Sequence, residues 1–171
     1  KPSRFYHDSF LDNFQSKPRV TKQYILSESY QLCQHLREIY QDRAGDLWFG
    51  TNVYGLMRYN GDTLHYITEQ EGFSGGRVTG IAEDSEGHLW VATGFGLNKY
   101  DGQSFTVFTE EDGLLNSEIW SMYIDSEGVI WIGHNDGLSR FDGTKFENIV
   151  IPNPEVKAPN TIYSANRITG I

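Results

Sequence analysis

The side chains best suited to contact a ligand lie where otherwise similar segments of the chain differ. Aromatic rings beside short polar groups suit carbohydrates or peptides, because sugars stack on rings and hydrogen-bond at their rims. Seven residues of these types are predicted to share one face as a ligand-binding site: Tyr54, Arg77, Phe95, Glu118, His134, Asn135 and Asp136. The alternative interpretation is a variable solvent-exposed surface that binds nothing.

Residues suited to catalysis or metal binding form no recognisable set. The five histidines are scattered along the chain without the spacing of metal ligands. Cys33 is the single cysteine, which excludes an intrachain disulfide and a cysteine-based metal site. The sequence contains no nucleophile elbow and no phosphate-binding glycine loop. We therefore predict no catalytic residue, no metal and no cofactor, while an acid–base pair assembled between distant segments stays open.

The candidate site residues belong to a threefold repeat. Similar apolar segments surround Trp48, Trp90 and Trp131, and a Gly-Leu dipeptide follows each segment. Successive Gly-Leu dipeptides are 41 residues apart. A period of this length with strand-like segments is typical of a β-propeller, in which each repeat forms one blade.

The middle repeat shows how a blade is expected to form. Residues 77–84, 89–92, 96–100 and 104–109 are predicted to be four strands joined by tight turns. The second of these strands is apolar throughout, so both of its faces should be buried between neighbouring blades. The expected fold is an all-β propeller with three complete four-stranded blades and partial blade strands at both ends.

The repeats also predict the domain organisation. Residues 1–23 match no repeat and are expected to be an N-terminal linker or packing arm, while residues 24–171 hold the propeller repeats. The blades are expected at approximately 35–76, 77–116 and 117–151, with the start of a further blade at 165–171. Three blades do not close a ring, so missing blades or self-association should complete it. Because the chain begins with Lys1, we expect a piece of a longer protein without its leader.

The tryptophans and aspartates that recur in each repeat could suggest a binding function, but their positions indicate a structural role. The three tryptophans lie mid-strand in the most apolar segments, so they are predicted to pack in the core and not to form a sugar-stacking platform. Asp42, Asp84 and Asp125 precede the turns. Aspartates there usually bond to backbone N–H groups, and no loop with several oxygen ligands follows that would bind calcium.

Charge and hydropathy exclude further classes of function. The formal net charge is −9 over 171 residues, with an isoelectric point near 4.9. An acidic surface repels phosphate backbones, so nucleic acid is not expected as a partner. No apolar run in this chain approaches the length of a membrane span.

The middle and third repeats resemble the two-component regulator propeller repeat. The resemblance rests on the run from Ile81 to Thr93 with Gly96-Leu97 and Tyr100-Asp101-Gly102, and on the run from Ile124 to Leu138. It covers roughly residues 24–151. Such repeats are best known from extracytoplasmic sensor domains of bacterial hybrid two-component systems, often in gut Bacteroidetes, where paired propellers sense oligosaccharides.

The resemblance implies a periplasmic or extracellular, non-enzymatic sensor module with an oligosaccharide ligand. Any kinase would lie outside this chain. Two alternatives stay open. One is a structural or protein–protein interaction scaffold, and the other is a propeller polysaccharide lyase or hydrolase.

Overall fold

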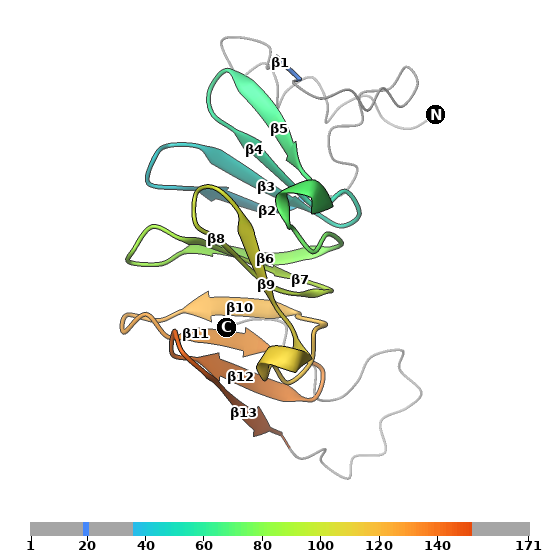
Figure 1. Cartoon of the computed structure of the whole chain (residues 1–171), viewed down its shortest axis with the longest axis vertical. Helices are drawn as coiled ribbons and strands as arrows, with labels where there is room; N and C mark the ends of the chain where they lie inside the picture. The colour runs from blue at the N-terminus through green and yellow to red at the C-terminus, as the bar shows by residue number, and fades with distance from the viewer. Residues whose placement is uncertain (1–18, 21–35, 152–171) are drawn as a thin grey trace.

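The computed structural model describes residues 19–20 and 36–151. These residues form short strands and two single-turn 3-10 helices, arranged as three antiparallel sheets stacked along the long axis of the molecule (Figure 1). Each sheet is one blade, and the four antiparallel strands of each blade are neighbours in the sheet in their order along the chain. The predicted all-β fold with four-stranded blades is confirmed, and the described blades do not close into a ring.

The strands have the following bounds. Blade 1 contains β2 (Leu36–Gln41), β3 (Leu47–Thr51), β4 (Leu56–Tyr59) and β5 (Thr63–Ile67). Blade 2 contains β6 (Val78–Glu83), β7 (Leu89–Thr93), β8 (Gly96–Tyr100) and β9 (Phe105–Phe108). Blade 3 contains β10 (Ser121–Ile124), β11 (Ile130–Gly133), β12 (Gly137–Phe141) and β13 (Phe146–Val150). The helices η1 (Glu69–Glu71) and η2 (Glu110–Asp112) begin the connections between blades.

The ends of the chain are described only in part. The two-residue strand β1 (Arg19–Val20) pairs in parallel with β5 and so adds a fifth strand at the outer edge of blade 1. The partial blade strands expected at both ends, including the start of a further blade at 165–171, lie outside the described residues.

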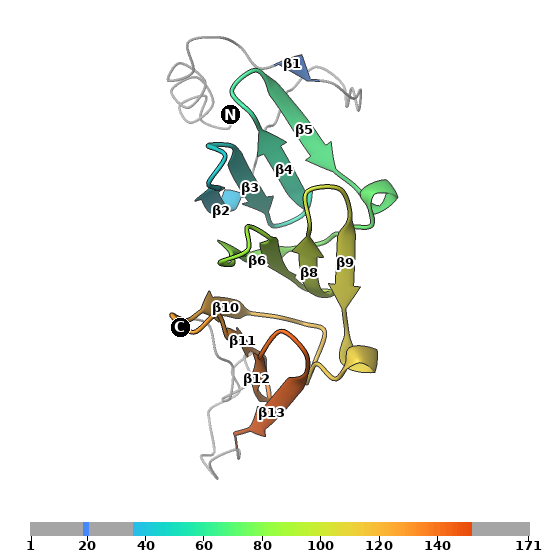
Figure 2. The same cartoon turned by 60° about the vertical axis from the view of Figure 1, so that its left-hand side comes forward.

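The first strands of the three blades lie next to one another. β6 contacts both β2 and β10, as expected for strands that surround a propeller axis. The view in Figure 2 shows β2, β6 and β10 along one side, with β5, β9 and β13 toward the other side. The ends of the blades therefore form two faces, each lined by turns.

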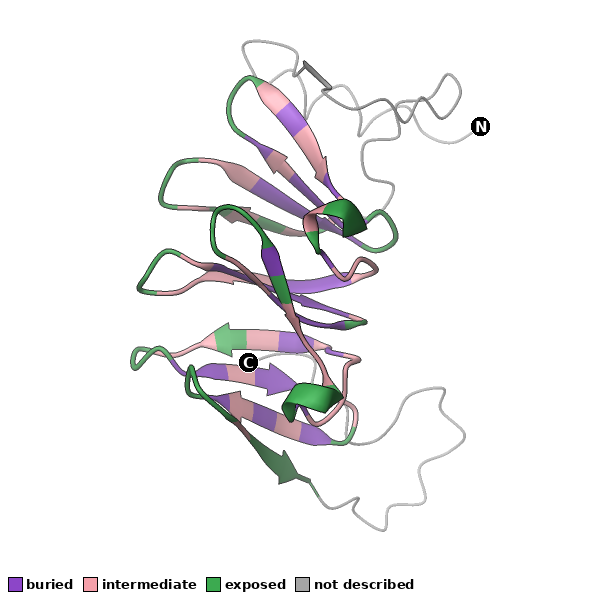
Figure 3. Cartoon of the chain, viewed as in Figure 1, coloured by how far each residue is buried: buried purple, intermediate pink, exposed green. Residues whose placement is uncertain are grey.

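The hydrophobic core lies between blades. One cluster joins Trp48 and Leu56 of blade 1 to Val91 and Phe105 of blade 2. A second cluster joins strands of blade 2 to strands of blade 3 in the same way. All five residues of β7 are buried, whereas β13 is mostly exposed (Figure 3). β7 is buried because blades 1 and 3 cover both faces of blade 2.

The repeated aspartate and tryptophan form one structural unit in every blade. In blade 2, Asp84 accepts hydrogen bonds from the backbone N–H of Glu86 and His88 and, at 2.8 Å, from Trp90 Nε1. Asp42 with Trp48 and Asp125 with Trp131 repeat the 2.8 Å bond to the indole. The structural interpretation of the aspartates is confirmed.

The tryptophans differ in burial because the blades differ in their neighbours. Trp48 packs edge-on against Tyr100 of blade 2, and Trp90 stacks with Phe108 and contacts Phe141 of blade 3. Both indoles are buried. Trp131 is half-buried, since no described blade follows blade 3. Core packing is thus confirmed for the first two tryptophans and is incomplete for the third.

Candidate functional site

One end of each blade combines the turn between its second and third strands with the connection between blades. In the described residues this face consists of turns 52–55, 94–95 and 134–136 and connections 68–77 and 109–120, and it is called the linker face below. The turns present Tyr54 and Phe95, whose side chains are 50% and 62% exposed. Exposed aromatic rings on neighbouring blades are the type of group that a sugar or peptide can contact.

Arg77 and Glu118 meet at the junction of blades 2 and 3. Arg77 Nη2 lies 3.2 Å from Glu118 Oε1, and the guanidinium carbon lies 3.9 Å from the ring centre of Trp120. Within the described part of the chain, the buried Nε of Arg77 has no hydrogen-bond partner. The arginine is therefore held by a charge pair on one side and by an indole face on the other.

Phe95 adjoins this pair through the backbone. Gly94 N–H donates to the carbonyl of Arg77 at 3.0 Å, and the backbone N–H of Phe95 donates to Thr93 Oγ1 at 3.0 Å. A Cβ on Gly76 would lie 2.6 Å from the Phe95 ring. Glycine is needed at residue 76 so that the ring can pack on the connection. The structure thus places Arg77 against Glu118 and, through the backbone of Gly94, beside Phe95.

His134 is not on the surface. Its side chain is fully buried, and Nε2 lies 2.9 Å from Ser139 Oγ. The Ser139 hydroxyl donates to Asn148 Oδ1 at 2.7 Å, so His134 Nε2 must be the donor in the bond between histidine and serine. Burial lowers the pKa of His134, while the backbone of Glu118 offsets part of this effect. The histidine therefore stabilises blade 3 and does not present its ring to a ligand.

The remaining two predicted residues lie in the turn after His134. Asn135 is half-buried and Asp136 is exposed, and the carbonyl of Asp136 accepts a 3.3 Å hydrogen bond from Ile151 N–H. Among the described residues the Asp136 carboxylate has no hydrogen-bond or ion-pair partner, and the bond from Ile151 fixes its backbone on the linker face of blade 3.

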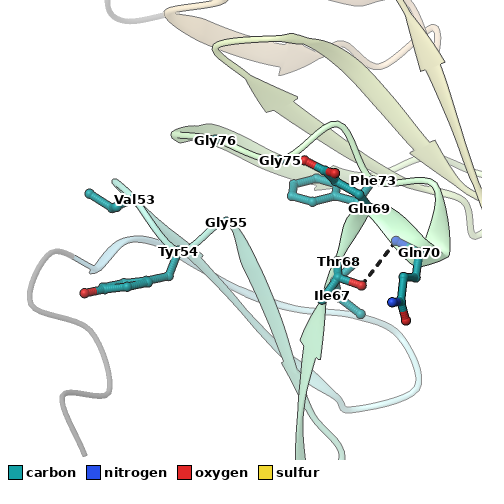
Figure 4. Close-up of a pocket in the computed structure, with 10 residues that line it drawn as sticks. All are labelled: Val53, Tyr54, Gly55, Ile67, Thr68, Glu69, Gln70, Phe73, Gly75 and Gly76. Carbon is teal, nitrogen blue, oxygen red and sulfur yellow. Dashed lines mark hydrogen bonds between the residues drawn. The ribbon is translucent and has the colours of Figure 1, made fainter. Parts of the chain in front are cut away.

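A depression of about 380 Å³ opens on the linker face of blade 1. Figure 4 shows Val53 and Tyr54 of the β3–β4 turn on one side and Thr68, Glu69 and Gln70 on the other, with Phe73 between them. The buried ring of Phe73 packs within 3.2 Å of the position that a Cβ on Gly55 would take. Tyr54 is the predicted residue that lines the depression.

Sequence reasoning missed Glu69 and Gln70, although a local signal was present. Thr68 and Glu71 form a capping box, in which the Glu71 carboxylate accepts from the backbone N–H of Thr68 at 2.9 Å. A threonine followed three residues later by glutamate is the sequence signature of this motif. Glu69 and Gln70, the first two residues of η1, line the depression. Within the described ranges, no group of three histidine, cysteine, aspartate or glutamate side chains is arranged to hold a metal ion.

The blade geometry and the inter-blade core define a β-propeller. Residues 32–53, 72–95 and 113–136 match the model of the two component regulator propeller family. Three segments of the chain therefore match repeats of that family, and the predicted resemblance is confirmed. No curated protein sequence matches the chain significantly.

Several solved structures share this arrangement. The extracellular domain of a protein assigned to a hybrid two component system from B. thetaiotaomicron is 30% identical, with a TM-score of 0.63 over 75% of this chain. A second extracellular domain from that organism, assigned to a one component system, is 21% identical, with a TM-score of 0.60 over 72% of this chain. The chain spans only 18% and 19% of these two structures.

Two other neighbours come from different settings. PorZ, a surface component of the type-IX secretion system of Porphyromonas gingivalis, is 28% identical, with a TM-score of 0.51 over 64% of this chain and 18% of its own. Virginiamycin B lyase from Staphylococcus aureus is 17% identical, with a TM-score of 0.54 over 70% of this chain and 42% of its own, which shows the fold alone.

The structural neighbours also indicate the cellular location of the protein. The 30% identical B. thetaiotaomicron structure is an extracellular domain, in agreement with the predicted periplasmic or extracellular location. Among the residues that the structure describes, no helix has the length and apolar character needed to cross a membrane.

Proposed function

We propose that this chain is part of an extracytoplasmic sensor propeller, and that its linker face recognises an oligosaccharide without transforming it. The match of three successive repeats to the two component regulator propeller family carries this proposal. The 30% identical extracellular domain of a hybrid two component system supports the sensor role. The exposed rings of Tyr54 and Phe95, beside hydrogen-bonding groups, support a sugar as the ligand.

A non-enzymatic role agrees with the surroundings of His134 and Glu118, the two residues that a lyase or hydrolase on this face would most plausibly use. His134 is fully buried and bonded to Ser139, so it does not reach a substrate. Glu118 is paired with Arg77. The lyase neighbour is similar in fold only.

The proposal is tested by thermal unfolding of the full chain with a panel of oligosaccharides from plant, algal and host glycans. A ligand that binds only the folded state at one hundred times its dissociation constant adds about 2.7 kcal/mol of stability. For a domain of this size the midpoint should rise by roughly 5–10 °C.

The variants Tyr54→Ala and Phe95→Ala should reduce that rise. The control is Tyr123→Ala, which removes an exposed tyrosine from β10 and should leave it intact. If no glycan shifts the midpoint, oligosaccharide recognition by this chain is wrong.

A scaffold role is the second candidate, and the similarity to PorZ favours it. If the chain is a scaffold, no glycan of the panel should raise its unfolding midpoint, and pull-downs with the full chain should retain a protein partner. Loss of that partner in the Phe95→Ala and Asp136→Ala variants would assign the linker face to protein binding.

A further inference from the structure

Glu69 and Glu110 begin equivalent 3-10 helices in successive repeats, yet their carboxylates have different surroundings. Glu110 Oε1 accepts a 2.8 Å hydrogen bond from the backbone N–H of Ser117 and so is tied to its own connection. The side chain of Glu69 has no hydrogen bond or ion pair with any described residue. The two repeats can thus be compared directly: Glu110 has a structural hydrogen bond, and its counterpart Glu69 has no partner among the described residues.

The difference arises from the glycines of the first connection. Gly75 and Gly76 replace Asn116 and Ser117, and both have positive φ, 79° and 78°. This backbone lets the Phe95 ring pack on Gly76, and its N–H groups make no bond to Glu69. The carboxylate is left at the rim of the depression, which it lines together with both glycines.

The hydrogen-bonding side chains that line the depression are neutral or negatively charged, and none is positively charged. Tyr54 offers a phenol, Gln70 an amide and Glu69 a carboxylate, and none of these side-chain groups is bonded to another described residue. The lining contains one acidic and no basic side chain. The nearby Arg77 guanidinium is paired with Glu118. The whole chain carries a formal charge of −9. An anionic ligand would therefore meet repulsion without a compensating cation.

We propose that this depression binds an uncharged sugar unit and discriminates against uronic acids. The sugar ring stacks on Tyr54, its hydroxyls donate to the Glu69 carboxylate, and Gln70 supplies a donor and an acceptor. A charged acceptor makes stronger hydrogen bonds to hydroxyls than a neutral one. The volume of about 380 Å³ lies in the range of small-molecule sites. This inference rests on the proposed function, and it assigns the ligand class and two residues that the sequence did not indicate.

The test uses pairs of tetrasaccharides that differ only at C6, in the gluco, galacto and manno series; β-1,4-mannotetraose and β-1,4-tetramannuronate are one such pair. Affinities for the full chain are measured by calorimetry at low salt. The neutral member of the recognised pair should bind at least roughly fivefold more tightly, the ratio expected for two like charges about 4 Å apart in water.

The variant Glu69→Gln should act in opposite directions on the two ligands. Affinity for the neutral sugar should fall roughly fivefold, while affinity for the acidic sugar should stay or rise. The matched control is Glu111→Gln, which removes the same charge from the exposed first turn of η2 in the next repeat. Both positions are exposed, so neither variant should unfold, and circular dichroism checks this.

The outcomes separate the inference from the function on which it depends. Tighter binding of an acidic member, or neutral-sugar affinity unchanged in Glu69→Gln, overturns the inference and leaves oligosaccharide recognition standing. If no member of any pair binds, the proposed oligosaccharide ligand is wrong and the inference fails with it. Equal losses in Glu69→Gln and Glu111→Gln would show a general charge effect and would also overturn it.

Discussion

Arg77 and Glu118 occupy the same position in successive repeats and form an ion pair across a blade junction, with 3.2 Å between Nη2 and Oε1. Residues at equivalent positions of successive repeats lie next to each other around the propeller axis. Opposite charges at this position stabilise the contact, and the Trp120 ring covers the guanidinium from the other side.

Removing the arginine should cost more stability than neutralising its partner. Arg77→Ala loses both the charge pair and the contact with Trp120, so its unfolding free energy should fall by about 1–2 kcal/mol. Glu118→Gln loses only a partly exposed charge pair and should cost less than about 1 kcal/mol. Urea unfolding measures both, and equal losses would contradict a role for the indole.

The aspartate that anchors each tryptophan should be essential for its blade. Asp84→Ala leaves the buried Trp90 Nε1–H and two turn N–H groups without their acceptor, which should cost about 2–3 kcal/mol of unfolding free energy. Glu86→Ala changes the same turn at an exposed residue and should cost less than about 0.5 kcal/mol. Comparable losses would disprove the anchoring role.

The same aspartates should make the fold sensitive to acid. Burial acts to raise the pKa of Asp84, but hydrogen bonds from Trp90 and His88 outweigh it and lower the pKa below the ordinary 3.8. The indole of Trp131 likewise lowers the pKa of Asp125 below 3.8. The unfolded chain then binds protons first, so this stability is complete above about pH 4 and is lost as the pH falls further.

Urea midpoints between pH 2 and pH 5 measure this loss. The double variant Asp84→Asn with Asp125→Asn should be less stable at neutral pH and should show a flatter decline in acid. A decline as steep as that of the unmodified chain would assign acid sensitivity to other carboxylates.

His134 should add a second, separate pH dependence. Because burial lowers the pKa of His134 below 6.5, the unfolded state binds the proton more readily than the folded state. Its contribution is present above about pH 6.5 and decreases as the pH falls through the lowered pKa. Replacement by threonine, the residue at this position in the other two repeats, should flatten the stability profile between pH 5 and pH 7. Midpoints of urea unfolding measured at half-unit pH steps test this.

The outer strand of blade 3 should promote self-association. Val150 in β13 is 65% exposed, and β13 pairs with β12 on one side only in the described sheets. An exposed apolar edge strand is a template for pairing with another chain. Light scattering of the full chain should show a mass that grows with concentration, and Val150→Lys should reduce it. A concentration-independent monomer would contradict this expectation.

The sequence predicted most where each repeat carried the same signal. The apolar segment around Trp90 and the preceding Asp84 were sufficient to predict a buried second strand and an anchored turn. Their physical roles follow from local chemistry that is the same in all three copies. The proximity of Arg77 and Glu118 also followed, because a fixed period places equivalent residues on adjacent blades.

The sequence predicted least where a side chain's direction mattered. His134 differs from Thr51 and Thr93, and this difference suggested a surface ligand. The ring instead points into blade 3, because Ser139 provides an acceptor there. Glu69 was overlooked because the equivalent residue of the next repeat, Glu110, is also a glutamate, so the sequence shows no difference at this position. The change that frees it lies seven residues away, at Gly76, and acts through the path of the backbone.

The placement of the core between blades has a consequence for motion. Both inter-blade clusters draw on blade 2, whereas blades 1 and 3 each contribute to one of them. Opening blade 2 would expose apolar surface on two sides at once, and opening an outer blade would expose it on one. Amide hydrogens of β7 and β8 should therefore exchange with deuterated water most slowly, and the chain should fray from its ends toward its middle repeat.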